Sequence, residues 1–256
     1  MKTIKGLKLI LTRMMTIFAC LVLLVTFAPL TQHGPVAENG PDNPLSYWSF
    51  NECSTTSAPD SAGGHDGVIL GATSITGPDG SCALQFDGDD YVYCDTLGLN
   101  APSQLTVEAW VKSSQSSNHQ TILSSGQESA PAGTFWIHRL ADSDILRFEY
   151  HNGSTPWEAV SINGYFTGMD NQWVHVAITA DYTTGEVVVY RDGERFPSAG
   201  TSFSMGGNPV SPQKDRLWMG SYNGGMLFLN GSLDEVRIYE YLLDPATIAE
   251  HAGQVT

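Results

Sequence analysis

The chain is divided into short segments in which apolar and polar residues alternate, and glycine, asparagine or aspartate separates most of them. Alternation with a period of two is typical of β-strands that bury one face. About twelve such segments follow one another without long helical stretches, which favours an all-β fold, a two-sheet antiparallel sandwich or jelly roll. The predicted strands are Ser46–Phe50, Val68–Leu70, Ala83–Phe86, Tyr91–Tyr93, Leu105–Lys112, Gln120–Ser124, Thr134–Leu140, Ile145–His151, Trp157–Ile162, Trp173–Ala180, Glu186–Arg191, Arg216–Gly220 and Ser232–Tyr239.

One short helix is predicted near the end of the chain, over Asp244–His251. Asp244 is a favourable N-cap residue because its carboxylate can accept hydrogen bonds from free backbone amides of the first turn. Pro245 suits the first helical position, where its missing amide proton costs nothing.

The N-terminal region has the charge order of an export signal. A basic stretch precedes an apolar run over Met14–Leu30. Because this run is near the minimum length of about 17 residues for a membrane span, a retained anchor is the competing interpretation. We expect a signal peptide over residues 1–30, a linker rich in Gly, Pro, Asn and Asp over 31–44, and one domain over 45–253. The protein would then be secreted, periplasmic or displayed at the cell surface, with membrane contact only if the segment is retained.

The chain is strongly acidic, with 12 basic and 27 acidic residues. Four of the basic residues lie in the predicted signal peptide, so the exported part keeps eight against 27 acidic residues, a net charge of −19. Such a surface repels phosphate backbones, which excludes nucleic acid as the expected partner. It suits cation binding.

Seven segments, in this order and spacing, resemble the concanavalin A-like lectin/glucanase superfamily in its laminin G-like (LamG) branch. The resemblance implies a two-sheet jelly roll, commonly an accessory or adhesion module of secreted bacterial proteins that binds glycans and carries a structural calcium ion. The fold alone does not fix the function. The segments are Tyr47–Phe50, Asp60–Gly63, Ala83–Gly88, Val107–Val111, Trp173–Ala177, Val189–Gly193 and Gly231–Tyr239.

Three cysteines lie beyond the signal peptide: Cys53, Cys82 and Cys94. Export makes a disulfide plausible. The resemblance favours Cys53 with Cys82, because relatives carry cysteines at these two places. Cys82 with Cys94, which flank one hairpin, is the rival pairing, and three reduced thiols are the remaining alternative.

Calcium prefers several oxygen ligands, which carboxylates and loop carbonyls supply. Asp60 lies in a Gly-rich loop, Asp87 in a hairpin turn and Asp234 at the start of the last strand. First and last strands lie close in a jelly roll, so we expect Asp60 and Asp234 to converge. The alternative is that each is an ordinary turn or strand-end carboxylate.

A candidate ligand face lies on the middle strands. Arg147, Glu149 and His151 alternate with apolar residues and should face away from the core. If His138 of the preceding strand shares that face, and Trp157 opens the next strand, the sheet presents the residue types that bind sugars: aromatic rings and planar hydrogen-bonding groups. The alternative is a solvated sheet face with cross-strand charge pairs.

Trp218 and Tyr222 flank a Gly-rich loop that could form the rim of this site. We therefore predict a carbohydrate-binding or adhesion module whose partner is a polysaccharide or glycan and whose cofactor is structural Ca²⁺.

The alternative is a polysaccharide lyase or glycoside hydrolase, with catalytic residues drawn from His138, Arg147, Glu149, Tyr150 and His151. The chain lacks the Glu-x-Asp-x-(x)-Glu strand of the superfamily's glucanases, which weakens this alternative. A structural or self-associating surface protein is a third class.

Overall fold

The computed structural model describes residues 42–99, 101–126, 134–151, 158–198, 200–205 and 216–253. The predicted signal peptide and the linker up to residue 41 lie outside this part, as does Trp157. Asp42 and Asn43 already contact the domain: the Tyr239 hydroxyl donates to Asp42 Oδ1 over 3.1 Å, and the Asn43 amide donates to the Tyr241 hydroxyl over 3.3 Å. These two residues therefore lie against the sandwich.

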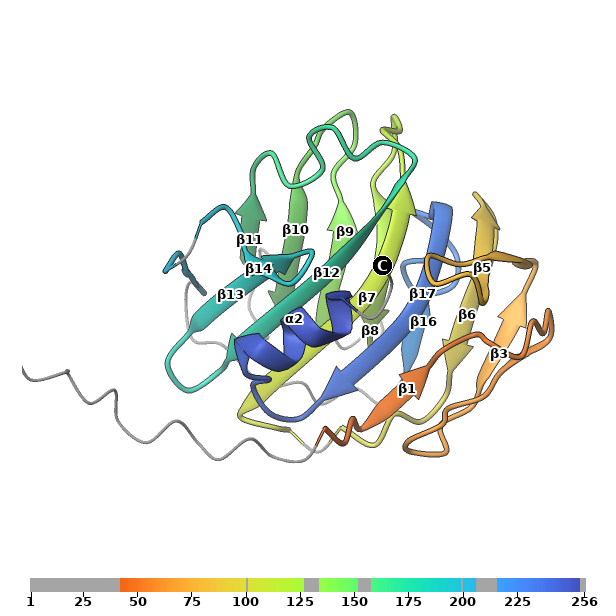
Figure 1. The fold of residues 1–256 in the computed structure, drawn as a ribbon, viewed down its shortest axis with the longest axis horizontal. Coiled ribbons are helices and arrows are strands. Elements are labelled where there is room, and N and C mark those ends of the chain that lie inside the picture. The colour runs from red at the N-terminus through yellow and green to blue at the C-terminus, as the bar shows by residue number, and fades with distance from the viewer. Residues whose placement is uncertain are drawn as a thin grey trace, which may run out of the picture. The chain divides into compact units, whose positions relative to one another are not determined.

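Two antiparallel sheets form the domain, as the alternating pattern predicted (Figure 1). Among the residues that the structure describes, sheet A has nine strands in the order β14-β13-β12-β7-β17-β5-β4, with β1 also paired to β17 and β15 to β13. Its strands are β1 (Ser46–Trp48), β4 (Thr73–Thr76), β5 (Cys82–Asp87), β7 (Gln104–Ser113), β12 (Gln172–Asp181), β13 (Glu186–Arg191), β14 (Glu194–Arg195), β15 (Phe203–Ser204) and β17 (Asn230–Tyr239).

Within the described part of the chain, sheet B has eight strands in the order β11-β10-β9-β8-β16-β6-β3-β2. Its strands are β2 (Ser57–Ala58), β3 (Gly67–Leu70), β6 (Tyr91–Cys94), β8 (Gln120–Ser125), β9 (Thr134–Arg139), β10 (Leu146–His151), β11 (Glu158–Ile162) and β16 (Leu217–Met219). The predicted strands recur here within a few residues. Short strands such as β2 and β14 were not foreseen, because two residues carry no periodic signal.

The main core lies between the sheets. Inward residues of both sheets, such as Phe86 and Val111 of sheet A and Phe135 and Phe148 of sheet B, are at most 1% exposed. Trp48 of β1 is fully buried and its indole Nε1 donates to the His65 carbonyl over 3.1 Å. Burial of these large side chains is the main source of stability.

Helix α2 (Pro245–Gly253) covers part of the outer face of sheet A (Figure 1). Ile248 packs with Tyr190 and Tyr239 in a second, smaller apolar cluster. The predicted cap is present: Asp244 Oδ1 accepts hydrogen bonds from the amides of Ala246 and Thr247 at 2.9 and 3.1 Å. No helix within the described ranges combines the length and hydrophobicity that a bilayer span requires.

Cys53 and Cys82 form a disulfide, the pairing that the resemblance favours. Cys94 is a buried free thiol whose Sγ donates to the Thr96 carbonyl, and burial raises its pKa to about 11. The rival Cys82–Cys94 bond is therefore not formed. The disulfide ties the loop after β1 to the start of β5.

We expect loss of this disulfide to lower the free energy of unfolding by about 3 kcal/mol, because the cross-link restricts a long loop of the unfolded chain. The cysteines are 29 residues apart. Urea unfolding of the Cys53→Ala/Cys82→Ala double variant measures the loss. Dithiothreitol should destabilise the wild type to a similar extent and leave the double variant unchanged. Equal stability of the wild type and the double variant in the absence of dithiothreitol would contradict the prediction.

Candidate functional site

The register of β9 and β10 brings three of the predicted ligand residues, His138, Arg147 and Glu149, to one face. Arg147 is paired with His138 on one side and Ser161 on the other, and Glu149 is paired with Trp136. Directly paired residues of antiparallel strands share a face. These side chains therefore lie on the outer face of sheet B, opposite the core.

His138 lies on this face but is not accessible: it is fully buried. Its ring stacks on Trp136, with centroids 3.6 Å apart and planes 7° from parallel, and it meets His119 edge-on at 5.3 Å. Tyr222 reaches Trp136 from the loop after β16, at 4.7 Å. His138 therefore lies on the predicted face but is covered by neighbouring rings.

His138 and Glu149 form a hydrogen bond of 3.2 Å between Nε2 and Oε1. Burial lowers the pKa of His138 and outweighs the opposing effect of Glu149, so the ring is favoured in its neutral form. Burial raises the pKa of Glu149, but hydrogen bonds from His138 and Arg147 outweigh it and lower that pKa overall. The carboxylate is thus held ionised between the two.

Arg147 is the accessible member of the group, with 31% of its side chain exposed. Its Nε donates to Ser161 Oγ over 3.1 Å, and its Nη1 donates to Glu149 Oε1 over 3.2 Å. Two anchors fix the plane of the guanidinium while part of it faces solvent. His151 ends β10, and its side chain, like Trp157, lies outside the described part of the chain.

Tyr150 belongs to the core, where it is 1% exposed. The alternation of β10 places it on the side opposite Arg147 and Glu149. The residues of the enzyme hypothesis therefore do not share one face.

Sequence reasoning missed Trp136 as the centre of the outer face. The available signal was its spacing, two residues before His138 on the same strand. Trp218 and Tyr222, predicted as a rim, are 5% and 8% exposed. Trp218 is paired with Ser124 on one side and Tyr93 on the other, so aromatic side chains continue across the face. These rings are mostly packed rather than open.

Asp60 organises its loop. Its carboxylate accepts hydrogen bonds from four backbone amides, those of Tyr47, Ala62, Gly63 and His65, at 2.8 to 3.1 Å. Burial raises the pKa of Asp60, but the hydrogen bonds from these amides outweigh burial, and the pKa is lowered overall. Its oxygens are engaged as turn acceptors.

Asp234 is fully buried at the start of an irregularity in β17. Its Oδ1 accepts the amide of Glu235 over 3.0 Å, whereas its Oδ2 has no hydrogen-bond partner among the described residues. Burial, then the charge of Glu235, raises the pKa of Asp234 to about 8. This carboxyl is therefore largely protonated at neutral pH unless a cation compensates it.

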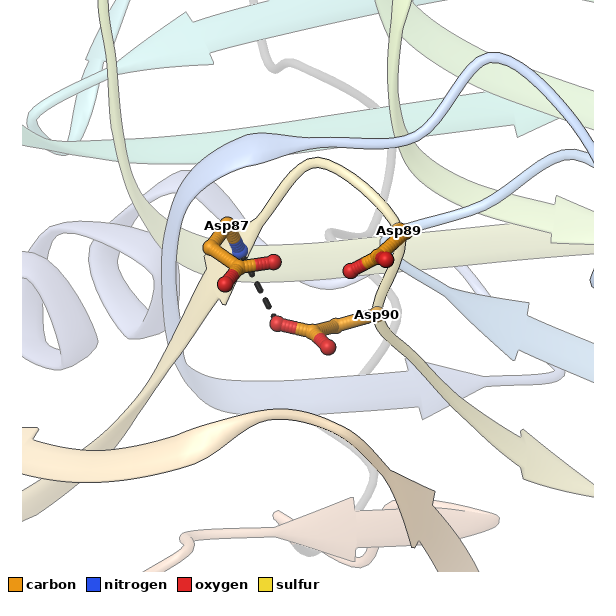
Figure 2. A group of neighbouring side chains, drawn as sticks. All are labelled: Asp87, Asp89 and Asp90. Carbon is orange, nitrogen blue, oxygen red and sulfur yellow. Dashed lines mark hydrogen bonds between the residues drawn. The ribbon is translucent and has the colours of Figure 1, made fainter.

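Asp87, Asp89 and Asp90 form an acidic cluster at the hairpin between β5 and β6 (Figure 2). Within the described ranges they are the one group of three or more potential ligand residues, each with an atom within 4.8 Å of the others. The amide of Asp87 donates to Asp90 Oδ2 over 2.9 Å. Of the three predicted calcium ligands, only Asp87 belongs to this cluster.

The fold and the outer face define a lectin-like β-sandwich. The chain belongs to the concanavalin A-like lectin/glucanases superfamily: a laminin G-type family model with that description matches residues 86–249. No curated protein matches the chain.

Solved structures with this fold include carbohydrate-related proteins. Domain 4 of AbnA, a GH43 extracellular arabinanase from Geobacillus stearothermophilus solved in complex with arabinotriose, is 24% identical, covers 82% of this chain and 98% of its own, and has a TM-score of 0.62. The binding domain of botulinum neurotoxin serotype G is 11% identical, with coverages of 82% and 51% and a TM-score of 0.63.

A third similar structure is the binding domain of botulinum neurotoxin DC in complex with SialylT, which is 13% identical, with coverages of 84% and 52% and a TM-score of 0.63. This chain therefore spans about half the length of the toxin chains that it matches. At these identities the likeness shows the fold alone.

Asp234 gives the fold a pH dependence of defined sign. Its pKa is about 8 in the folded protein and near 4 in an unfolded chain, so the folded state binds more protons in this window. The contribution of Asp234 to the free energy of unfolding should therefore fall as the pH rises from about 4 to about 8, whereas the lowered pKa of buried His175 acts in the opposite direction. We expect Asp234→Asn to lack the Asp234 contribution, so that the stability of the variant relative to the wild type rises from about pH 5 to about pH 8. Urea unfolding at about pH 5 and pH 8 in EDTA measures it. The exposed Asp142→Asn serves as control. An unchanged pH dependence in Asp234→Asn would contradict the prediction.

Proposed function

We propose that this chain is an exported, non-catalytic glycan-binding module that holds saccharide on the outer face of sheet B around Arg147. Membership of the lectin/glucanase superfamily supports the class. The ligands bound in two similar structures, arabinotriose and SialylT, support saccharide as the ligand. The basic and apolar N-terminal region supports export. The Cys53–Cys82 disulfide supports an oxidising compartment.

The observation that carries the proposal is the fixed, partly exposed guanidinium of Arg147. Ser161 and Glu149 hold it in one plane, so little further freedom is lost when it binds a ligand. A planar guanidinium can donate two parallel hydrogen bonds to adjacent oxygens. Vicinal sugar hydroxyls offer such a pair. His151 and Trp157 are proposed to extend the site, Trp157 by stacking on a sugar ring.

Binding without bond cleavage is the part of the proposal that separates it from the enzyme alternative. An acid–base pair must reach the scissile bond. His138 and Glu149 are buried and hydrogen-bonded to each other, and Tyr150 faces the core. These placements support binding of the glycan without cleavage of its glycosidic bonds.

Arg147→Ala should weaken glycan binding roughly tenfold to a hundredfold, the scale of about 1.5–3 kcal/mol for hydrogen bonds to a charged group. A glycan array that includes arabinan and sialylated fragments selects the ligand, and calorimetry on the strongest hit measures affinity. Arg195→Ala on sheet A is the matched control and should bind normally. Unchanged affinity in Arg147→Ala, or release of new reducing ends from the ligand, would refute the proposed function.

We also propose that Asp87, Asp89 and Asp90 hold a structural calcium ion. Their carboxylates fit a hard cation because several oxygens gather at one hairpin. A hydrogen bond with Asp87 and its charge raise the pKa of Asp89. Burial, with the charge of Asp87, raises the pKa of Asp90. Bound calcium would relieve this repulsion and fix the turn that leads into β6.

Calcium should raise the melting temperature of the wild type after EDTA treatment, whereas Asp89→Asn should gain less. In EDTA the variant should be at least as stable as the wild type, because one repelling charge is gone. Differential scanning fluorimetry with added CaCl₂ or MgCl₂ makes the comparison, with Asp142→Asn as control. A wild-type midpoint that is the same in EDTA and in CaCl₂ would remove calcium from the proposal.

A further inference from the structure

A polar cavity of about 340 Å³ lies where segments distant in the sequence meet at sheet A. Asp42 and Asn43 come from the segment before β1, Ser61 from the loop after β2, Arg237 from β17 and His251 from α2. The size is at the lower end of the range for small-molecule sites. The cavity is on the opposite sheet from Arg147, so it is separate from the site proposed above.

Arg237 supplies an unsatisfied donor at this cavity. The residue is 6% exposed, and its Nη2 donates to Glu235 Oε2. Its Nη1 has no hydrogen-bond partner among the described residues; Glu108 Oε1 is 4.0 Å away. The guanidinium lies 4.2 Å from the centroid of the Tyr47 ring, which also lines the cavity. A buried cationic donor without a partner is costly, and a small shift of the side chain into the cavity would let a ligand hydroxyl relieve the cost.

The other walls are held in place by hydrogen bonds. His251 Nδ1 lies 2.6 Å from Glu108 Oε1, and His251 Nε2 lies 3.1 Å from Asp42 Oδ2. The Tyr47 hydroxyl donates to Glu235 Oε2 over 2.6 Å. The cavity is thus built before any ligand arrives, which lowers the entropic cost of binding.

The charges around the cavity select the class of ligand. Arg237 is compensated by Glu235, and His251 by Glu108 and Asp42, so no uncompensated cation is present to attract an anion. The remaining groups mix donors and acceptors: the guanidinium, the side-chain amide of Asn43 and the half-exposed Asp42 carboxylate, whose side chain is 53% exposed. Hydroxyl groups, which donate and accept at once, match such a mixture.

We propose that this cavity is a second saccharide site, which takes one neutral sugar unit between Arg237 and Asp42. The inference rests on the proposed glycan-binding function for its ligand class, but not on the Arg147 site. Two sites on opposite sheets cannot be covered by one short oligosaccharide. The module would then bind two strands of a polysaccharide, or two points on one chain, and gain avidity from both.

Nuclear magnetic resonance titration of the purified protein with L-arabinose, D-galactose, arabinotriose and D-galacturonate tests this site. At least one neutral probe should shift the amide signals of Asn43, Ser61 and Ala62 in a saturable way. Ala62→Trp should abolish these shifts, because Ala62 is exposed at the cavity and the indole fills it without touching the core. Ala246→Trp on the exposed face of α2 is the control and should retain them.

Arg147→Ala separates the two proposals. It should remove shifts around β10 and leave those at Asn43 intact if both proposals hold. Shifts at Asn43 that persist in Ala62→Trp, or that only galacturonate produces, would overturn the cavity proposal. The absence of any shift at these amides with all four probes would overturn it as well, whatever happens around β10.

Discussion

The rest of the structure depends on the pairing of strand β17 with its neighbours. It pairs with β7 along one side, and on the other with β5 over Asn230–Leu233 and then with β1 over Val236–Ile238. The change of partner coincides with a shift of register against β7. Glu235 sits there with a φ of 52°, in the left-handed region that non-glycine residues seldom adopt. Such a bulge re-aims side chains. The buried Asp234 carboxyl lies at the start of this irregularity, and Arg237, over the Tyr47 ring of β1, lies at its end, so the pH-sensitive group and the polar cavity flank the same feature.

The outer faces of the two sheets are covered in different ways. On sheet B, aromatic rings around Trp136 pack on one another and leave Arg147 accessible. On sheet A, α2 covers an apolar cluster and reaches a buried charge network through His251. Burial lowers the pKa of His251, yet its hydrogen bond with Glu108 outweighs this and raises the pKa overall. A buried carboxylate such as Glu108 needs a partner of this kind. The helix is therefore held by both packing and charge, and it closes one wall of the cavity.

The fold was predictable because its signals are local. Alternation placed Arg147 on the outer side of β10, and the residue types at the last helix predicted the cap at Asp244. The state of each site was not predictable, because it depends on contacts between distant segments. His138 faces outward as its strand requires, but it is buried: it stacks on Trp136 of the same strand, and His119, from before β8, meets it edge-on. Asp60 looks like a metal ligand in the sequence, whereas backbone amides of its own loop and of β1 engage it. No local pattern near Arg237 reveals a cavity whose other walls come from residues near positions 43, 61 and 251.

The two candidate sites share one electrostatic feature, an arginine paired with a nearby glutamate, on a chain that is acidic as a whole. Arg147 is paired with Glu149 two residues later, and Arg237 with Glu235 two residues earlier. Each glutamate orients its arginine and cancels most of its charge, so neither site is a strong attractor of anions. The net charge of the chain, −15, adds long-range repulsion against polyanions. A guanidinium compensated in this way still donates hydrogen bonds of fixed direction. At the two proposed sites, we expect that combination to discriminate by the geometry of hydroxyl groups rather than by charge, and so to favour neutral glycans.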